Sequence, residues 1–403
     1  MTLIESGPIN EARIVELVDG LLRDFPPATT DQHAFWGAQF DRGLAWVHFP
    51  EGRGGLDVSP KLQQVVDDRL RTAGAPDPML TNFMGIGMMG PTIVALGTDE
   101  QQERLLRPAF ACEEIWCQLF SEPGAGSDVA GLSTRAVLDG DEWVVNGQKV
   151  WTTLAHVARW GMLLARTDPE VPKHNGLTYF IVDMTQPAVD VRPLRQLTGE
   201  AEFNEVFFDG ARIPDSWRIG EVGDGWRVAI STLMNERVAL GALAKEDRGG
   251  GVIAHAVKLW HERGGDAERR DQLTTLWIRS EILRLTTLRA QSMRERGTPG
   301  PEGSILKLGI AELQHDIFEW CVHELGPEGM LISDYEMRRP TIMGETALGE
   351  HVEITKAFLA SKGTKIGGGT PEIGKNILGE RVLGLPGDVR TDRELPWSQV
   401  PRS

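Results

Sequence analysis

Two short stretches of the chain carry residue types from which a binding site for a flat, phosphorylated cofactor can be built. The first, FSEPGAGSD at 120–128, combines small residues with hydroxyls, and the second, QKVWTT at 148–153, ends in a Trp followed by two threonines. Glycine lets the backbone approach a ligand, hydroxyls bond its oxygens, and an indole offers a flat wall. The pair therefore predicts a cofactor cradle. The alternative is a structural loop beside a core Trp.

A carboxylate on an apolar helix face is the second chemical feature. Glu236 shares a predicted helical stripe with Ala229, Leu233, Leu240 and Leu243. The residues three and four positions away include no cation, so no ion pair within the helix accounts for the carboxylate. Desolvation at such a place raises the pKa of a carboxyl and makes it a competent proton acceptor. The alternative is a Glu paired with a distant Arg or lying at the edge of the stripe.

The elements that must position these residues fall into three blocks. Apolar residues recur at helical spacing from 11 to about 114 and again from 225 onward. Long helices are expected in the last block at 273–294, 305–325 and 349–361. Between these blocks, short apolar runs predict strands at 134–138, 143–146, 148–152, 160–165, 177–182 and 205–208. We predict an α+β fold with an N-terminal α-helical domain at 1–114, a middle β domain at 115–223 and a C-terminal α-helical bundle at 224–403.

Turn and cap signals mark the ends of several elements. The dipeptides Asp-Gly at 139–140 and Asn-Gly at 146–147 are typical of two-residue hairpin turns. Thr98 followed by Gln101 predicts a capping box, and Asp224 is a candidate N-cap. Thr370 is expected to cap the last helix, with Pro371 in its first position.

Composition narrows the function classes. The 403 residues carry a formal charge of −16, which argues against nucleic acid or an anionic membrane as partner. Three cysteines without metal-like spacing indicate neither a metal site nor a disulfide framework. The N-terminus shows no signal peptide, and no run approaches the roughly 18 apolar residues of a membrane span. A cytoplasmic protein is expected.

The order SEPGAGSD and then KVWTT closely resembles the flavin-binding signature of the acyl-CoA dehydrogenase family, and the helix, β, helix order extends the resemblance over essentially the whole chain. The resemblance implies a middle β-barrel domain, FAD as cofactor and an acyl-CoA substrate. The implied reaction is dehydrogenation to the trans-2-enoyl-CoA, by proton abstraction and hydride transfer to flavin N5. Electron-transfer flavoprotein or a similar acceptor, and a homo- or hetero-oligomer such as a dimer or tetramer, are the implied partners.

One departure from the family bears on the base. Many members take it from a Tyr-Glu-Gly-Thr segment, but this chain has GGGT at 367–370, with Gly368 where the Glu would be. A minority, such as the isovaleryl and long-chain enzymes, carry the base in a Glu-Arg pair on the first helix after the β domain. Glu236 and Arg237 match that pair, so Glu236 is the predicted base.

The remaining site residues are carried over from the family by position. The predicted cofactor-binding residues are Gln118, Phe120, Ser121, Ser127, Trp151, Thr152, Thr153, Thr370 and Glu372. The predicted substrate-side residues are Ser127, Arg237 and Gly369, and no metal is expected. An Arg-x-x-Phe-Gly segment that reaches the flavin of a neighbouring subunit in the family is missing from the corresponding region, 260–266, so altered adenine recognition or a changed oligomer is an open alternative.

Two other functions stay open. One is a non-catalytic or partner subunit of a mixed acyl-CoA dehydrogenase oligomer, because Gly368 removes the commonest base. The other keeps flavin but is an oxidase or a nitroalkane-type oxidation. With three consecutive glycines opposite the base, we hypothesise a wide pocket for branched, long or polycyclic acyl chains.

Overall fold

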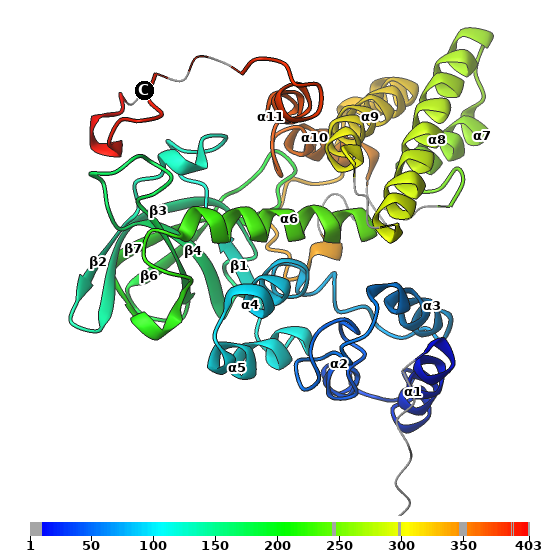
Figure 1. The fold of residues 1–403 in the computed structure, drawn as a ribbon. Helices are drawn as coiled ribbons and strands as arrows, with labels where there is room; N and C mark the ends of the chain where they lie inside the picture. Colours follow the sequence, from blue (N-terminus) through cyan, green and yellow to red (C-terminus); the bar gives the residue numbers. More distant parts are fainter. Residues whose placement is uncertain are drawn as a thin grey trace, which may run out of the picture.

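The three predicted blocks follow one another in the computed structural model, which describes residues 10–243, 247–296, 300–345, 353–387, 389 and 391–401 (Figure 1). The first block is helical. Its helices are α1 (Glu11–Asp24), α2 (Gln32–Asp41), α3 (Gln63–Thr72), α4 (Gly90–Leu96) and α5 (Asp99–Phe110), with a π-helical segment, Met84–Met89, before α4. The capping box at α5 is confirmed, since Gln101 N donates to Thr98 Oγ1 at 3.3 Å and Thr98 N donates to Gln101 Oε1 at 3.0 Å.

The second block is one eight-stranded sheet. Its strands are β1 (Trp116–Leu119), β2 (Arg135–Asp139), β3 (Glu142–Thr153), β4 (Trp160–Arg166), β5 (Leu177–Asp183), β6 (Val189–Pro193), β7 (Phe203–Pro214) and β8 (Arg218–Ile219). The order is β6-β7-β3-β2-β4-β5-β8, and β1 joins β4 as a parallel neighbour. β1 and β3, which carry four of the nine predicted cofactor-binding residues, therefore belong to the same sheet.

The two predicted hairpin turns have different outcomes. β2 and β3 form the first hairpin, closed by the pair Asp139 and Glu142, with Gly140 at φ 71°. The second prediction is wrong, because β3 runs without interruption through Asn146 and Gly147. Pairing with β7 continues on both sides of a register shift there, and a β-carbon on Gly147 would lie 2.5 Å from Thr134 Oγ1. The Asn-Gly signal thus marks a β-bulge and a close approach.

The third block contains six described helices. They are α6 (Gly225–Leu243), α7 (Val252–Arg263), α8 (Ala267–Glu295), α9 (Glu302–Leu325), α10 (Ile354–Thr364) and α11 (Pro371–Ile377). The start of the helix expected at 349–361 lies outside the described residues, and its described part continues to Thr364. Thr370 caps α11 as predicted, since Thr370 Oγ1 accepts from Ile373 N at 3.4 Å.

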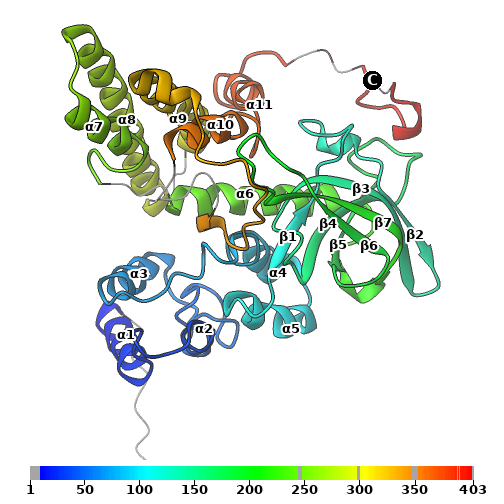
Figure 2. The ribbon, with the colours of Figure 1, turned by 180° about the vertical axis from the view of Figure 1, so that it is seen from behind.

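The first two blocks share a core. Buried residues of the N-terminal helices, one face of β4 and β5, and α6 form one apolar cluster, while the other face of the sheet has its own. A third cluster joins α7, α8 and α9. In both views α6 runs from the sheet toward α8 across the middle of the molecule (Figures 1 and 2). The division at 114 and 223 stays a prediction.

Candidate functional site

The two signature stretches lie side by side. Val150 N donates to Ser121 O at 2.9 Å. Lys149 Nζ donates to Phe120 O at 3.0 Å and to Glu122 Oε1 at 2.8 Å. These contacts join the glycine-rich loop to β3.

A buried ion pair holds this junction. The side chains of Lys149 and Glu122 are 0% and 5% exposed. The Glu122 carboxylate also accepts hydrogen bonds from Ser133 N at 2.7 Å and Thr134 N at 2.8 Å. Burial alone would raise the pKa of Glu122, but the Lys149 ammonium and these donors outweigh it and hold the pKa well below its ordinary range. Sequence analysis missed the pair, although opposite charges in the two motifs were a usable signal.

The outer surface of the junction is open around the glycines and Trp151. β-Carbons built on Gly124 and Gly126 would meet nothing within 4 Å, and Ser127 beside them is exposed. Trp151 is 58% exposed at φ 59°, and its ring packs edge-to-face with Phe203, with centroids 5.8 Å apart. Open backbone, an exposed serine and an accessible indole are the features that the flavin prediction requires.

Other predicted cofactor residues face inward. Phe120 is 4% exposed and packs edge-on against Tyr179, with ring centroids 5.8 Å apart. Thr152 is fully buried, and its Oγ1 has no hydrogen-bond partner in the part of the chain that is described. A register shift between Lys149 and Thr152, with Trp151 at φ 59°, interrupts the regular alternation of β3, so Trp151 is exposed while Lys149 and Thr152 are both buried. Gln118, Ser121 and Thr153 are partly exposed.

The residues of the last helix form a second group. Thr370 Oγ1 is engaged as the N-cap of α11, and Glu372 in the first turn is exposed. Among the described residues, no hydrogen bond, ion pair or ring contact joins Thr370 or Glu372 to the loop 120–128 or to Trp151. A role for these two residues in cofactor binding stays a prediction.

The predicted base meets the glycine turn. A β-carbon built on Gly368 would lie 3.6 Å from Glu236 Oε1 and 3.3 Å from Lys307 Cε. Glu236 is partly buried, and burial raises the pKa of its carboxyl, while the charges of Arg237 and Lys307 act in the opposite direction. The structure therefore places the Glu236 carboxylate within contact distance of residue 368.

The backbone at this turn explains the departure from the usual family pattern. Gly368 and Gly369 have φ of 66° and 96°, a region that favours glycine. A glutamate at 368 would be strained and would place a like charge beside Glu236. Gly369 and Arg237, the other substrate-side predictions, are both exposed.

Contacts with the N-terminal block hold α6 in place. Asn235 Nδ2 donates to Thr92 Oγ1 at 3.2 Å, and Thr92 Oγ1 donates to Thr232 Oγ1 at 3.1 Å. A β-carbon on Gly87 in the π-helix would lie 2.8 Å from Cβ of Ala239. The methionine-rich segment 82–96 thus packs against α6, which sets the position of Glu236. The side chains of Leu240 and Leu243, predicted on the same stripe, lie outside the described residues.

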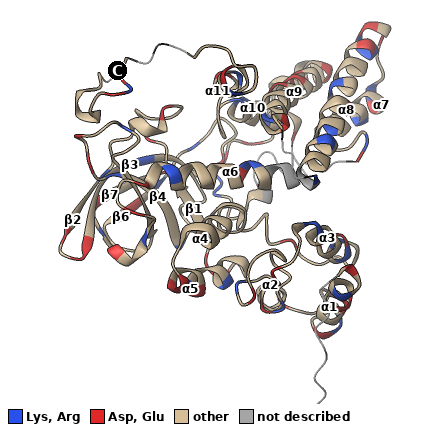
Figure 3. Ribbon diagram, viewed as in Figure 1, with Lys and Arg blue, Asp and Glu red and all other residues tan. Residues whose placement is uncertain are grey.

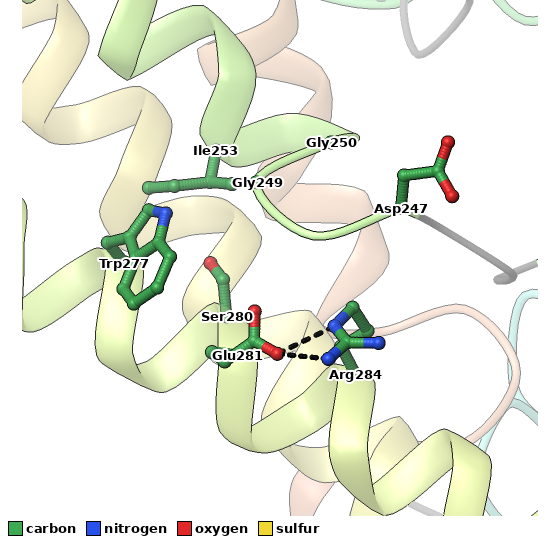
Figure 4. Close-up of a pocket in the computed structure, with 8 residues that line it drawn as sticks. All are labelled: Asp247, Gly249, Gly250, Ile253, Trp277, Ser280, Glu281 and Arg284. Atoms are coloured by element: carbon green, nitrogen blue, oxygen red, sulfur yellow. Dashed lines mark hydrogen bonds and ion pairs between the residues drawn. The ribbon is translucent and has the colours of Figure 1, made fainter.

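A pocket elsewhere contains none of the predicted residues. It lies between the start of α7 and α8 (Figure 4) and is lined by Asp247, Gly249, Gly250, Ile253, Trp277, Ser280, Glu281 and Arg284. Arg284 Nε donates to Glu281 Oε1 at 2.7 Å, so these two charges satisfy each other.

The described residues contain no group of three or more His, Cys, Asp or Glu able to hold a metal ion. They also contain no helix with the length and apolarity needed to cross a membrane. Figure 3 shows acidic and basic residues interspersed over the helices and the sheet.

Comparison with known proteins defines the chain as an oxidoreductase acting on the CH-CH group of donors. The chain belongs to the acyl-CoA dehydrogenase family. The family models of the acyl-CoA dehydrogenase N-terminal, middle and C-terminal domains match residues 23–113, 117–211 and 223–383, respectively. Members of this family are flavoproteins of lipid catabolism and typically use FAD.

Individual relatives agree. Acyl-CoA dehydrogenase IpdE1 of Mycobacterium tuberculosis is 38% identical over 353 residues, covering 86% of each chain. Acyl-CoA dehydrogenase FadE34 of the same organism is 39% identical over 350 residues, covering 86% of this chain and 45% of its own. Among solved structures, the ChsE4-ChsE5 complex of M. tuberculosis has 27% identity and a TM-score of 0.69, covering 96% of this chain and 100% of that one. A steroid ACAD, Tcur3481-Tcur3483, has 26% identity, a TM-score of 0.69 and the same coverage.

Proposed function

We propose that the chain is an FAD-dependent acyl-CoA dehydrogenase that converts an acyl-CoA thioester to the trans-2-enoyl-CoA, with Glu236 as the base. The observation that carries this proposal is the close approach of Glu236 Oε1 to the glycine turn at Gly368. Partial burial raises the pKa of the Glu236 carboxyl, which makes it a better proton acceptor.

The proposal assigns separate tasks to the two sides of the site. FAD, when bound, supplies the hydride acceptor. The chain contributes Ser127 and the exposed Trp151 to hold the cofactor, with Thr153 beside them. Glu236 takes the α-proton of the thioester, and partial burial of its carboxyl favours that transfer by raising its pKa.

We further propose a polycyclic acyl group as substrate. The three glycines at 367–369 add no side-chain volume opposite Glu236, which leaves room for a bulky chain. A structural relative is described as a steroid ACAD. A panel of acyl-CoAs with an artificial electron acceptor tests this substrate class, and a preference for short linear chains would contradict it.

The variant Glu236→Gln tests the proposed base. The protein should still bind flavin but fail to bleach it with any acyl-CoA, because an amide cannot accept the α-proton. Glu312→Gln, a partly buried glutamate on α9, is the matched control and should reduce flavin normally. Appreciable residual reduction in Glu236→Gln would contradict the assignment.

A second candidate is a partner subunit in a mixed oligomer. It is supported by Gly368 and by structural relatives that are named as pairs of chains, ChsE4-ChsE5 and Tcur3481-Tcur3483. The protein expressed alone would then purify without flavin, and added acyl-CoA would bleach nothing. Flavin content and light-scattering mass of the purified chain separate the two candidates. Electron-transfer flavoprotein as acceptor and a cytoplasmic location complete the proposal.

A further inference from the structure

A lysine that the sequence did not single out borders the proposed base. Lys307 lies on α9 and is partly buried. Its Nζ donates to Thr364 O, the carbonyl of the last residue of α10, at 2.6 Å. Lys307 Cε and Glu236 Oε1 both lie within 4 Å of the point where Gly368 would carry a β-carbon. Three elements, α6, α9 and the turn after α10, therefore converge on one gap.

The two charges act on each other without a direct ion pair in the described part of the chain. Burial lowers the pKa of Lys307, and Glu236 opposes that shift. Burial raises the pKa of Glu236, and the charges that oppose it are Arg237 on the same helix and Lys307 from α9. Arg237 has the larger opposing effect on the pKa of Glu236, but Arg237 is exposed and solvent screens its charge, whereas Lys307 is partly buried and borders the gap at Gly368.

We infer that Lys307 is a positioning residue, which keeps the Glu236 carboxylate ionised at the gap left by Gly368 and thereby sets the pH range in which Glu236 accepts a proton. The inference rests on the proposed function, because it gives Glu236 the role of base. The hydrogen bond to Thr364 anchors the ammonium, so its charge stays beside the carboxylate. The carboxylate itself remains free to take a proton from substrate.

The competing explanation is purely structural. A cation at the C-terminal end of a helix satisfies a free carbonyl and interacts favourably with the helix dipole, and Lys307 does this for α10. In that case its removal would loosen α10 and the turn without changing the titration of Glu236.

The experiment uses three variants of the flavin-loaded protein. Lys307→Gln removes the charge but keeps an N–H donor for Thr364 O, whereas Lys307→Arg keeps both. Lys362→Gln removes a lysine from α10 that binds His315 Nε2 at 3.0 Å and serves as the matched control. The two readouts are kcat/KM against pH and the titration of the Glu236 carboxyl by carbon-13 NMR, with its signal assigned by loss in Glu236→Gln.

In Lys307→Gln we expect the acid limb of the pH profile and the carboxyl titration to move together to higher pH. At pH 6 the expected loss of kcat/KM is about tenfold or more, recovering at alkaline pH, because the base is ionised in a smaller fraction of molecules. Lys307→Arg and Lys362→Gln should follow the wild type.

An unchanged carboxyl titration in Lys307→Gln, with activity lost equally at every pH, would overturn the inference in favour of the structural role. If Lys307→Gln does not fold, Lys307→Arg still tests the charge, and a titration displaced despite the retained cation overturns the inference. Failure of the proposed function has a different signature, because Glu236→Gln would then still reduce flavin, whatever the titration shows.

Discussion

The structure contains two glutamate-lysine neighbours that behave in opposite ways. Glu122 and Lys149 are in direct contact at 2.8 Å, almost fully buried, and the carboxylate accepts further hydrogen bonds from the loop. Glu236 and Lys307 are partly buried and interact only through their charges in the described part of the chain. The pKa of Glu122 is lowered, and the pKa of Glu236 is raised.

The difference lies in contact distance and hydrogen bonding. A carboxylate that is clamped by a cation and by backbone N–H groups stays ionised and serves as a structural tie. A carboxylate that is desolvated but not clamped keeps its affinity for a proton, which is what a base requires. The same two residue types therefore join the cofactor loop to β3 in one place and, in our proposal, perform proton transfer in the other.

The largest effect is expected from breaking the clamped pair. Lys149→Met leaves the Glu122 carboxylate buried without its cation, which typically costs about 3–5 kcal/mol of stability. We expect a strongly lowered melting temperature and loss of flavin, read by thermal denaturation and by absorbance at the flavin band. Lys258→Met, which breaks an exposed pair with Glu262 at 3.9 Å, should cost about 1 kcal/mol or less. Similar melting temperatures for the two variants would contradict a structural role for the buried pair.

A new carboxylate at the glycine turn should disrupt the interaction between Glu236 and Lys307. Gly368→Glu forces a side chain onto a backbone with φ 66°, at a cost of about 1–2 kcal/mol, and places a second negative charge beside Glu236. We expect turnover to fall by roughly tenfold or more because the two carboxylates compete for the same gap and for the charge of Lys307. Gly363→Glu, at a helical position with nothing within 4 Å, is the control. Full activity in Gly368→Glu would show that the glycine is not required.

The two glutamates should give stability opposite dependences on pH. Glu122 has a lower pKa in the folded state, so the folded protein binds its proton less readily than the unfolded chain does. The stability that ionised Glu122 contributes is therefore fully present above the ordinary pKa of 4.5 and is lost as pH falls below it. The folded state binds the Glu236 proton more readily, so its contribution falls as pH rises from 4.5 through the raised pKa. Melting temperatures from pH 3 to 8 should therefore show a weaker acid loss in Glu122→Gln and a weaker decline above pH 4.5 in Glu236→Gln. If the melting temperature of either variant depends on pH as the wild type does, the pKa shift of that glutamate is refuted.

The smallest effect on stability is expected at the exposed face of the cradle. Trp151→Ala removes a side chain that is 58% exposed, so the stability without cofactor should change by about 0.5 kcal/mol or less. Flavin affinity should nevertheless fall about tenfold, because the indole offers a flat surface to the ring system. Fluorescence titration of the flavin-free protein with FAD measures the affinity, and unchanged binding would exclude Trp151 from the cradle.

Much of this molecule follows from local sequence. The capping box at Thr98 and the N-cap at Thr370 form as predicted because each depends on residues within one helical turn. The order of the three blocks follows from apolar periodicity, and the family follows from the two signature stretches. The absence of a glutamate at Gly368 and the apolar stripe around Glu236 are also readable without a structure.

Only the tertiary structure decided which groups meet. Asn146 and Gly147 looked like a turn, but pairing with β7 keeps β3 continuous there. A second register shift along β3, between Lys149 and Thr152, leaves Trp151 exposed and Thr152 buried. Periodicity assigns a residue to a helix face, but it cannot name the residue on the facing helix. The charge of Lys307 reaches Glu236 because packing brings α9 and the glycine turn to α6. Electrostatic coupling depends on distance and burial, and both are properties of the packed fold.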